Sequence, residues 1–416
     1  MNFLADYLIY NSGNEVNEHY HLWSAMSALS SIVSRRIWVD QGYFRVYANM
    51  YVVLLGPPGN GKTTAMGCAK GLVRSIGNVP FSAQCQSKAN LVKEMMKYER
   101  GVMLANGQPL IYTPISIFVT ELSQFISIDP VKMLDLLVTI YDQDVYDMST
   151  QAHGHQQING PYMTLLGCTT SDWVTNYLKS DIITGGFTRR ALFILEDWSA
   201  NRRVPRPKLT DEMRAAWVRV ENRARQLAEV TGEFVWSQDA ERWFDHWYMT
   251  REIVKDANVA AFDRTRHTQL LKLAMLLELC RGDALVLHED TLVTALAMLD
   301  KLMIQLPVVF SGIGRNELAK TSTRLKNMLV RAGTPLAKKV IMEELWRDAN
   351  TAEIYQVFNH MIAMGAIVVF NGTGPDGVTR EWVALPGQAA SVQQASTPVH
   401  MPPAETEAGS TPSDSP

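Results

Sequence analysis

One stretch of the chain has the residue types and the spacing to bind a phosphate chain. The run Gly56-Pro-Pro-Gly-Asn-Gly-Lys62-Thr63-Thr64 fills every defined position of the pattern G-x-x-x-x-G-K-[ST]. Its glycines allow a tight turn whose amide groups point inward at a phosphate. Lys62 would contact the β- and γ-phosphates, and the Thr63 hydroxyl is a ligand for Mg²⁺. The predicted ATP-binding residues are Gly56, Pro57, Pro58, Gly59, Asn60, Gly61, Lys62, Thr63 and Thr64.

A carboxylate that activates water is expected near this loop. The β-rich run Ile115–Val119 is followed by Thr120 and Glu121, which places Glu121 just past a strand tip, where a catalytic base belongs. The usual pattern is Asp-Glu, so Thr120 replaces the first acid and would hold a metal-bound water more weakly. The predicted metal contacts are Thr63, Thr120 and Glu121. Glu121 could instead be a surface side chain, and the acid would then be Asp142 or Asp144.

A possible γ-phosphate sensor follows another predicted strand. Thr169 and Thr170 come after the predicted strand Tyr162–Leu166 and are candidate γ-phosphate sensors, with ordinary turn chemistry as the alternative.

Arg189 and Arg190 follow a glycine pair and precede the predicted strand Ala191–Leu195. In a phosphate-loop ATPase such a pair suggests an arginine finger for the neighbouring subunit, and a solvated basic turn is the alternative. Arg190 is favoured because it directly precedes the strand. If strand alternation extends back to this pair, Arg189 points to the opposite side.

The elements that must position these residues indicate an α/β protein. Strands and helices alternate from 46 to 197, a pattern typical of a parallel sheet flanked by helices. Residues 198–312 are amphipathic runs without predicted strands. The predicted regions are a helical segment 1–45, an ATPase core 46–197, a helical lid or bundle 198–312, a winged helix 318–386 and a disordered acidic tail 387–416.

The winged-helix prediction depends on three helices followed by a glycine-rich hairpin. The predicted helices are Ala319–Arg331, Lys338–Arg347 and Thr351–Met364, with Thr351 as N-cap and Gly365 as C-cap. The tail 387–416 lacks Lys and Arg and is expected to act as a spacer or as a docking peptide for a replication partner.

Composition narrows the function classes. The 416 residues carry a formal net charge of −3, which excludes a uniformly basic nucleic-acid coat but allows a local basic channel. The four cysteines form no CxxC pair, which argues against a zinc ribbon or a disulfide framework and fits a reducing cytosol. The longest apolar runs are much shorter than a membrane span. We therefore expect a soluble, cytoplasmic protein with no membrane partner.

Several motifs together resemble a family of phage and mobile-element P-loop ATPases, a primase–helicase-associated domain of unknown function. The resemblance covers roughly 15–310 and rests on Tyr20–Trp38, Gly56–Thr64, Phe118–Glu121, Leu136–Asp142, Gly160–Gly167 and Gly185–Arg190. It implies a RecA-like or AAA+-like core and a hexameric replicative DNA helicase. It also implies a helical lid from which Arg264 or Arg266 reaches the nucleotide, and the spacing does not decide between them.

Two regions are candidates for contact with DNA. Residues 142–160 contain no Lys or Arg but match the position of hairpins that project into the channel of ring helicases; an ordinary surface hairpin is the alternative. The region 318–386 is modestly basic, with Arg380 at the base of its predicted wing, and would bind DNA or protein. The alternatives to a motor are an ATP-dependent helicase loader or initiator, and a nucleotide-gated DNA-binding regulator.

Overall fold

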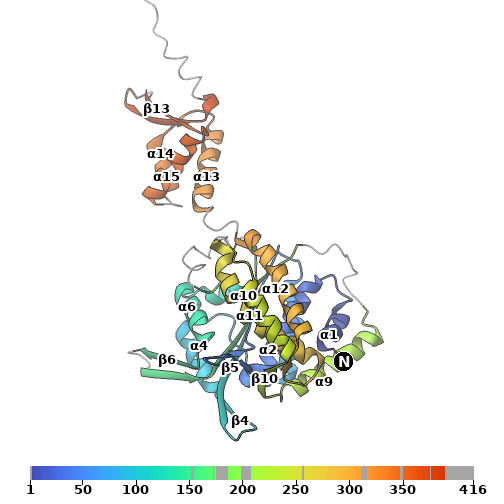
Figure 1. Ribbon diagram of the computed structural model, residues 1–416. Helices are drawn as coiled ribbons and strands as arrows, with labels where there is room; N and C mark the ends of the chain where they lie inside the picture. The colour runs from blue at the N-terminus through green and yellow to red at the C-terminus, as the bar shows by residue number, and fades with distance from the viewer. Residues whose placement is uncertain are drawn as a thin grey trace, which may run out of the picture. The chain divides into compact units, whose positions relative to one another are not determined.

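The chain has two compact units, which are described separately: residues 1–314 and residues 315–416. The computed structural model describes 2–150, 154–171, 173–174, 186–197, 208–254, 257–310, 316–346, 350–374 and 376–388 (Figure 1). The fold is mixed α/β with parallel sheets, as the sequence predicted.

The helices and strands of the first unit alternate over most of its length. In chain order they are α1 (Phe3–Asn11), α2 (Glu18–Val33), β1 (Ile37–Asp40), β2 (Arg45–Tyr47), β3 (Tyr51–Leu55), α3 (Lys62–Ile76), α4 (Lys88–Met95), β4 (Arg100–Met103), β5 (Pro109–Val119), α5 (Leu122–Ile126), α6 (Pro130–Ile140), β6 (Val145–Thr150), β7 (Gly154–Asn159), β8 (Pro161–Thr169), β9 (Ala191–Leu195), α9 (Asp211–Leu227), β10 (Gly232–Trp236), α10 (Gln238–Thr250), α11 (Ala257–Arg281), β11 (Val286–Leu287) and α12 (Glu289–Phe310). Short 3₁₀ turns follow α2 at Ser34–Arg36 and α4 at Met96–Tyr98.

The central sheet of this unit has the strand order β4-β5-β8-β3-β9. Strands β5, β8, β3 and β9 are parallel to one another, and β4 pairs antiparallel with β5 at one edge. The end of β3 is in register with both neighbours, because Leu55 lies opposite Thr169 and Leu195. Segments that follow β5, β8 and β3 therefore meet at one edge of the sheet, which is where parallel α/β sheets bind ligands.

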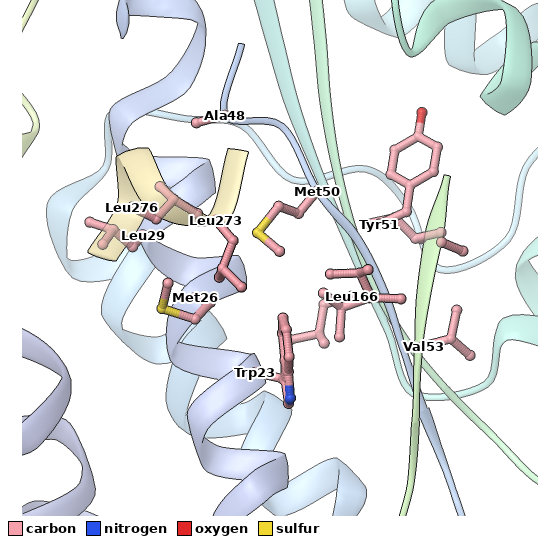
Figure 2. Close-up of a cluster of buried hydrophobic side chains, with 14 of the residues drawn as sticks. Trp23, Met26, Leu29, Ala48, Met50, Tyr51, Val53, Leu166, Leu273 and Leu276 are labelled. Carbon is pink, nitrogen blue, oxygen red and sulfur yellow. The ribbon is translucent and has the colours of Figure 1, made fainter. Parts of the chain in front are cut away.

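Helix α2 packs against this sheet together with the middle of α11. Strand β3 is buried along its whole length, as expected for a central parallel strand. Figure 2 shows Trp23, Met26 and Leu29 of α2 near Leu273 and Leu276 of α11, beside the strands. These side chains are all nearly inaccessible to solvent, so the N-terminal segment and the predicted lid share one hydrophobic core with the region 46–197.

A second sheet corrects two sequence predictions. Its order is β11-β10-β1-β2, with Ile37 of β1 opposite Gly232 of β10 in a parallel pair. The segment 1–45 is therefore not only helical, and 198–312 is not free of strands. Because the paired strands are far apart in the sequence, no local pattern of residues indicates that they pair.

Residues 142–160 form the antiparallel hairpin that the sequence predicted. Strands β6 and β7 pair with each other as a separate two-stranded ribbon, and they project at the edge of the first unit, as does β4 (Figure 1). Its tip, 151–153, lies outside the described residues.

Helix α12 is long and apolar enough to cross a membrane by length and composition, although no unbroken apolar run marks it in the sequence. Leu292, Leu299 and Leu306 on one face are buried in the core of the first unit. Asp300 on the same helix pairs with Arg266 of α11 at 2.7 Å. These contacts are those of a core helix in the first unit.

The elements with given bounds in the described part of the second unit are three helices and a three-stranded antiparallel sheet. They are α13 (Asn316–Ala332), β12 (Leu336–Ala337), α14 (Lys338–Leu345), α15 (Thr351–Ala363), β13 (Val368–Thr373) and β14 (Thr379–Ala384), with strand order β12-β14-β13. Leu329, Ile341 and Phe358 from the three helices pack in a core of their own. The short strand β12 was not predicted. The predicted tail lies outside the described residues from 389 onward.

The caps of α15 differ by one residue from the sequence prediction. Asn350, not Thr351, is the N-cap, because its side chain accepts from Glu353 N–H at 3.0 Å while the Glu353 carboxylate accepts from Asn350 N–H at 2.9 Å. This reciprocal pair is a capping box. Met364 is the C-cap, and Gly365 follows it with φ +66°, the left-handed conformation that favours glycine.

Candidate functional site

The loop between β3 and α3 is a tight turn, as the glycine pattern predicted. Gly59 and Gly61 have φ of +82° and +87°, which side chains other than glycine rarely adopt. A Cβ atom on Gly61 would lie 2.5 Å from the Val16 side chain, and one on Gly56 would overlap Asn60 and Tyr20. The loop therefore needs glycine both for its backbone shape and for its close contact with the N-terminal segment.

Lys62 is the first residue of α3 and turns back toward the loop. Its Nζ donates to the carbonyls of Gly56 (2.7 Å) and Pro57 (2.8 Å) and to Asn60 Oδ1 (3.0 Å). Burial lowers its pKa, while the nearby Cys168 and Glu121 act in the opposite direction. A buried ammonium group thus lies within the turn, beside the N-terminus of a helix, where anions are stabilised. Thr63 and Thr64 follow it and are exposed.

Tyr20 of α2 holds the base of the loop, a role that the sequence did not reveal. Its hydroxyl contacts the Leu55 and Glu196 carbonyls, the latter at 2.9 Å. Asn60 Nδ2 donates to the Tyr20 hydroxyl at 2.7 Å and to the Glu196 carbonyl at 3.1 Å. The polar contacts of Tyr20 become visible only once α2 is placed on the sheet.

The Glu196 carboxylate is held by the segment that precedes Tyr20. His19 Nδ1 lies 2.6 Å from one carboxylate oxygen, and Asn17 Nδ2 donates to the other at 2.7 Å. Glu196 directly follows β9, so this cluster ties the N-terminal segment to the same edge of the sheet as the loop. The hydrogen bond to Glu196 raises the pKa of His19.

A titration tests this cluster. We expect the His19 pKa to lie above its ordinary value of 6.5 and to return toward it in Glu196→Gln, as followed by NMR of the imidazole ring. Because folding raises this pKa, the pair stabilises the fold fully below about pH 6.5, and this contribution is lost as pH rises through the folded-state pKa. Glu15→Gln, an exposed acid on the same segment, is the matched control. An unshifted His19 in the unaltered protein would contradict the pairing.

Thr120 and Glu121 lie at the same edge, directly after β5. Both side chains are exposed, and β8 separates their strand from β3. Gln84 fixes this strand end, since its Oε1 accepts from Thr120 N–H at 3.3 Å and its Nε2 donates to the Phe118 carbonyl at 2.9 Å. Lys70 of α3 donates to the same carbonyl at 3.0 Å. Gln84 and Lys70 therefore fix the strand end that carries Thr120 and Glu121.

Strand β8 brings two polar residues between the loop and this acid. The strand extends three residues past the predicted Leu166, so Thr169 is its last residue and is buried, whereas Thr170 begins the following turn and is half-buried. Cys168, which the sequence analysis did not consider for the site, lies near both Lys62 and Glu121. Burial raises the pKa of its thiol to about 12, so it remains a neutral group between them.

Arg189 and Arg190 lie where the parallel strands start, at the opposite side of the sheet from the strand ends that carry the loop. Arg190 immediately precedes β9, and its Nη2 and Nε atoms contact Asp142 Oδ2 at 2.9 and 3.1 Å. The condition under which Arg189 would point to the opposite side is not met, because 187–190 form a turn in which Arg190 N–H and Ala191 N–H both donate to the Phe187 carbonyl. Strand alternation does not extend into this turn, and both arginines line one cavity.

The alternative acids also lie away from the loop. Asp142 is engaged by Arg190, and Asp144 pairs with Arg35. The Asp144 carbonyl accepts from Gly160 N–H, just before the start of β8. Both carboxylates therefore lie near the strand starts, not near the strand ends that carry the loop.

The structure does not bring Arg264 or Arg266 to the loop of their own subunit. Both lie on α11, where Thr265 donates to the Arg189 carbonyl at 3.0 Å, so this part of the helix lies at the arginine edge. Arg266 pairs with Asp263 and Asp300 at 3.4 and 2.7 Å. Arg264 is exposed.

The residues at the loop edge fit Mg²⁺ with a phosphate chain better than Mg²⁺ alone. Among the described residues, no group of three or more His, Cys, Asp or Glu side chains could hold a metal. Mg²⁺ retains waters and is commonly bound through one or two protein oxygens together with substrate phosphates. The Thr63 and Thr120 hydroxyls and the Glu121 carboxylate, all on exposed residues, are protein oxygens that could take part in this arrangement.

No protein-family model matches the chain, and no curated protein matches it in sequence.

Proposed function

We propose that the chain is an ATP-hydrolysing P-loop ATPase with a RecA-like or AAA+-like core. The observation that carries this proposal is the meeting of three features at one sheet edge. These are the glycine-shaped loop with its buried Lys62 after β3, the polar Thr169 at the end of β8, and Glu121 after β5. Along the ends of β3, β8 and β5, in this order, they place a positive charge, a hydroxyl and a carboxylate.

Each residue then has a distinct role in hydrolysis. Lys62 and the loop amides bind the β- and γ-phosphates, and Thr63 and Glu121 supply oxygen ligands. Mg²⁺ would neutralise the charge that develops on the phosphates. Glu121 accepts a proton from the attacking water, and Thr169 or Thr170 donates to a γ-phosphate oxygen. Tyr20 and Asn60 keep the loop closed against Glu196, so the N-terminal segment positions the phosphate site.

Glu121→Gln tests the assignment of the base. We expect hydrolysis to fall by about 10²–10⁴-fold while ATP binding persists, because glutamine preserves size and hydrogen bonding but cannot take the proton. Steady-state phosphate release and binding of a fluorescent ATP analogue measure the two effects. Glu212→Gln, an exposed acid at the start of α9, is the control. Near-normal turnover in Glu121→Gln would place the base elsewhere.

The position of the arginines supports an oligomer. Strand β9 has five residues, so its two ends are roughly 13 Å apart at about 3.3 Å per residue. Arg189 and Arg190 at its start are therefore remote from the loop of their own subunit, as a residue acting in trans must be. We propose a homo-oligomer, with a hexameric ring as the expected form, in which Arg190 contacts the γ-phosphate bound to a neighbour.

We further propose that the protein is a cytoplasmic DNA helicase or translocase of phage or mobile-element replication. The resemblance to phage and mobile-element ATPases supports this, as do the β6–β7 hairpin and the second unit, whose helices and hairpin suit a winged helix. There, Lys338, Lys339 and Arg380 line a groove beside the exposed Trp346. All three cations are already paired, Lys338 with Glu381, Lys339 with Glu343 and Arg380 with Asp376, so this groove suits a protein partner as well as DNA.

One experiment separates the motor from its alternative. Electron microscopy with single-stranded DNA and a non-hydrolysable ATP analogue, together with a strand-displacement assay, should show closed rings and ATP-dependent unwinding. ATP-dependent DNA binding without strand displacement would favour the alternative function, a helicase loader or replication initiator.

A further inference from the structure

A cavity of about 310 Å³ lies at the sheet edge opposite the phosphate loop. Its walls come from the segment before β3, the end of α6, the turn before β9 and the middle of α11. The cationic side chains that line it are Arg45, Arg189, Arg190 and Lys272. Two carboxylates, Asp142 and Asp144, line it as well. The cavity is therefore predominantly positive.

The two carboxylates do not neutralise all of these cations. Asp142 forms a two-point contact with Arg190, and Asp144 pairs with Arg35. For Arg189 the structure shows no ion pair with any described residue, and its Nε atom is buried without a hydrogen-bond partner there. A buried guanidinium N–H without an acceptor is costly. An anion in the cavity would supply the acceptor that Arg189 Nε lacks.

Lys272 of α11 is a second cation in the cavity lining whose charge is not balanced by an anion. It is 2% exposed, its Nζ donates to Asn49 Oδ1 at 2.6 Å, and it lies 4.0 Å from the Tyr141 ring centroid. An ammonium group has three donors, and one neutral oxygen with one ring face does not balance its charge.

The pKa of Lys272 reflects this surrounding. Burial lowers it to about 7, with Arg190 and Arg35 acting in the same direction and Asp142 opposing them. Arg189 also lines the cavity and adds positive charge, whereas Arg45 in the same lining pairs with Asp40 at 3.8 Å. A bound anion would favour the protonated form, because an opposite charge nearby raises the pKa of an amine.

We propose that this cavity is a second phosphate site, which binds the terminal phosphate of a nucleotide through Arg189 and Lys272. The Thr268 hydroxyl in the wall is a neutral donor for the same group. The volume is at the lower end of ligand pockets, which suits a compact, doubly charged group. The site is separate from the proposed active site of its own subunit, and only one of its two possible sources depends on the proposed function. The phosphate comes either from a free nucleotide or from a nucleotide on the loop of a second copy of this chain.

Calorimetric titration of pyrophosphate into the full-length Lys62→Ala protein tests the site with the first loop disabled. We expect saturable binding that Lys272→Met and Arg189→Gln, each added to Lys62→Ala, weaken by about 10-fold or more, as loss of a charge-assisted hydrogen bond implies. Methionine keeps the length of the lysine chain in a buried position, and Arg189 is partly exposed, so the two variants make different demands on folding. Arg281→Ala, also on α11 but paired with Asp290, is the matched control.

The pH dependence gives an independent readout. Binding should be stronger well below the Lys272 pKa of about 7 than well above it, and this difference should shrink in Lys272→Met. The ionisation of pyrophosphate itself is the same for both proteins, so the comparison isolates Lys272. Absence of pyrophosphate binding, or equal affinity in the variants and the Lys62→Ala parent, would overturn the proposal, whether or not the protein hydrolyses ATP.

A fluorescent, non-hydrolysable ATP analogue then distinguishes the two sources. Binding to Lys62→Ala alone that Lys272→Met abolishes supports a free nucleotide. A Lys272-dependent signal that appears only after mixing with Arg190→Ala subunits, whose loops are intact, supports the nucleotide of a neighbour. A signal insensitive to Lys272→Met in both arrangements would overturn the assignment to nucleotides.

Discussion

Lys62→Ala should abolish ATP hydrolysis, with a loss of at least about 10²–10³-fold, the usual effect of removing one electrostatic contact to a reacting group. The physical reason is that Lys62 provides the buried ammonium group within the loop. Neighbouring Thr63 and Thr64 offer only neutral hydroxyls. Phosphate release under saturating ATP measures the effect.

The fold should survive this change. The three hydrogen bonds made by Lys62 go to the loop itself, and Tyr20 and Asn60 still tie the loop to Glu196. Thermal unfolding by circular dichroism checks this point. Arg74→Ala removes a positive charge from the exposed end of the same helix and should leave hydrolysis unchanged. Hydrolysis by Lys62→Ala at the normal rate and with a normal KM would rule out the loop as the catalytic phosphate site.

Arg190→Ala should lose most hydrolysis while each subunit still binds ATP. An arginine that stabilises the transition-state charge on a γ-phosphate contributes about 10³–10⁵-fold to the rate. In the isolated subunit Arg190 is paired with Asp142, so a trans contact requires the arginine to exchange this carboxylate for a phosphate. The loop of the altered subunit, including Lys62, is at the other edge of the sheet and is not disturbed.

Mixing two inactive variants is the decisive measurement. Lys62→Ala subunits keep Arg190, and Arg190→Ala subunits keep the loop. Where the two kinds of subunit alternate in an oligomer, every second interface has an intact loop on one side and Arg190 on the other. Activity should therefore partly return on mixing. A mixture of Lys62→Ala with the double variant Lys62→Ala/Arg190→Ala is the control and should stay inactive. If freely exchanging subunits restore nothing, Arg190 does not act in trans, and the ring proposal loses its main support.

Some features of this protein could be predicted from local sequence because they depend on neighbouring residues. The bounds of β3 and β9 were predicted correctly from short apolar runs, and the glycine-rich loop was predicted at the start of α3. A glycine that must adopt positive φ and a lysine at a helix start leave a signature within a few residues. The hairpin at 142–160 was predicted from its position in the chain, which matches that of hairpins in ring helicases.

Other features were decided only by the tertiary structure. The Tyr20 contact with Glu196 joins residues 176 positions apart, and the pairing of β1 with β10 joins segments that are even farther apart in the sequence. The ion pair of Arg266 with Asp300 joins α11 to α12. Arg189 and Arg190 occupy one cavity because the chain turns before β9, which no alternation rule reveals. In each case the energy that fixes the side chain comes from a partner brought by folding, and the sequence around the residue carries no trace of that partner.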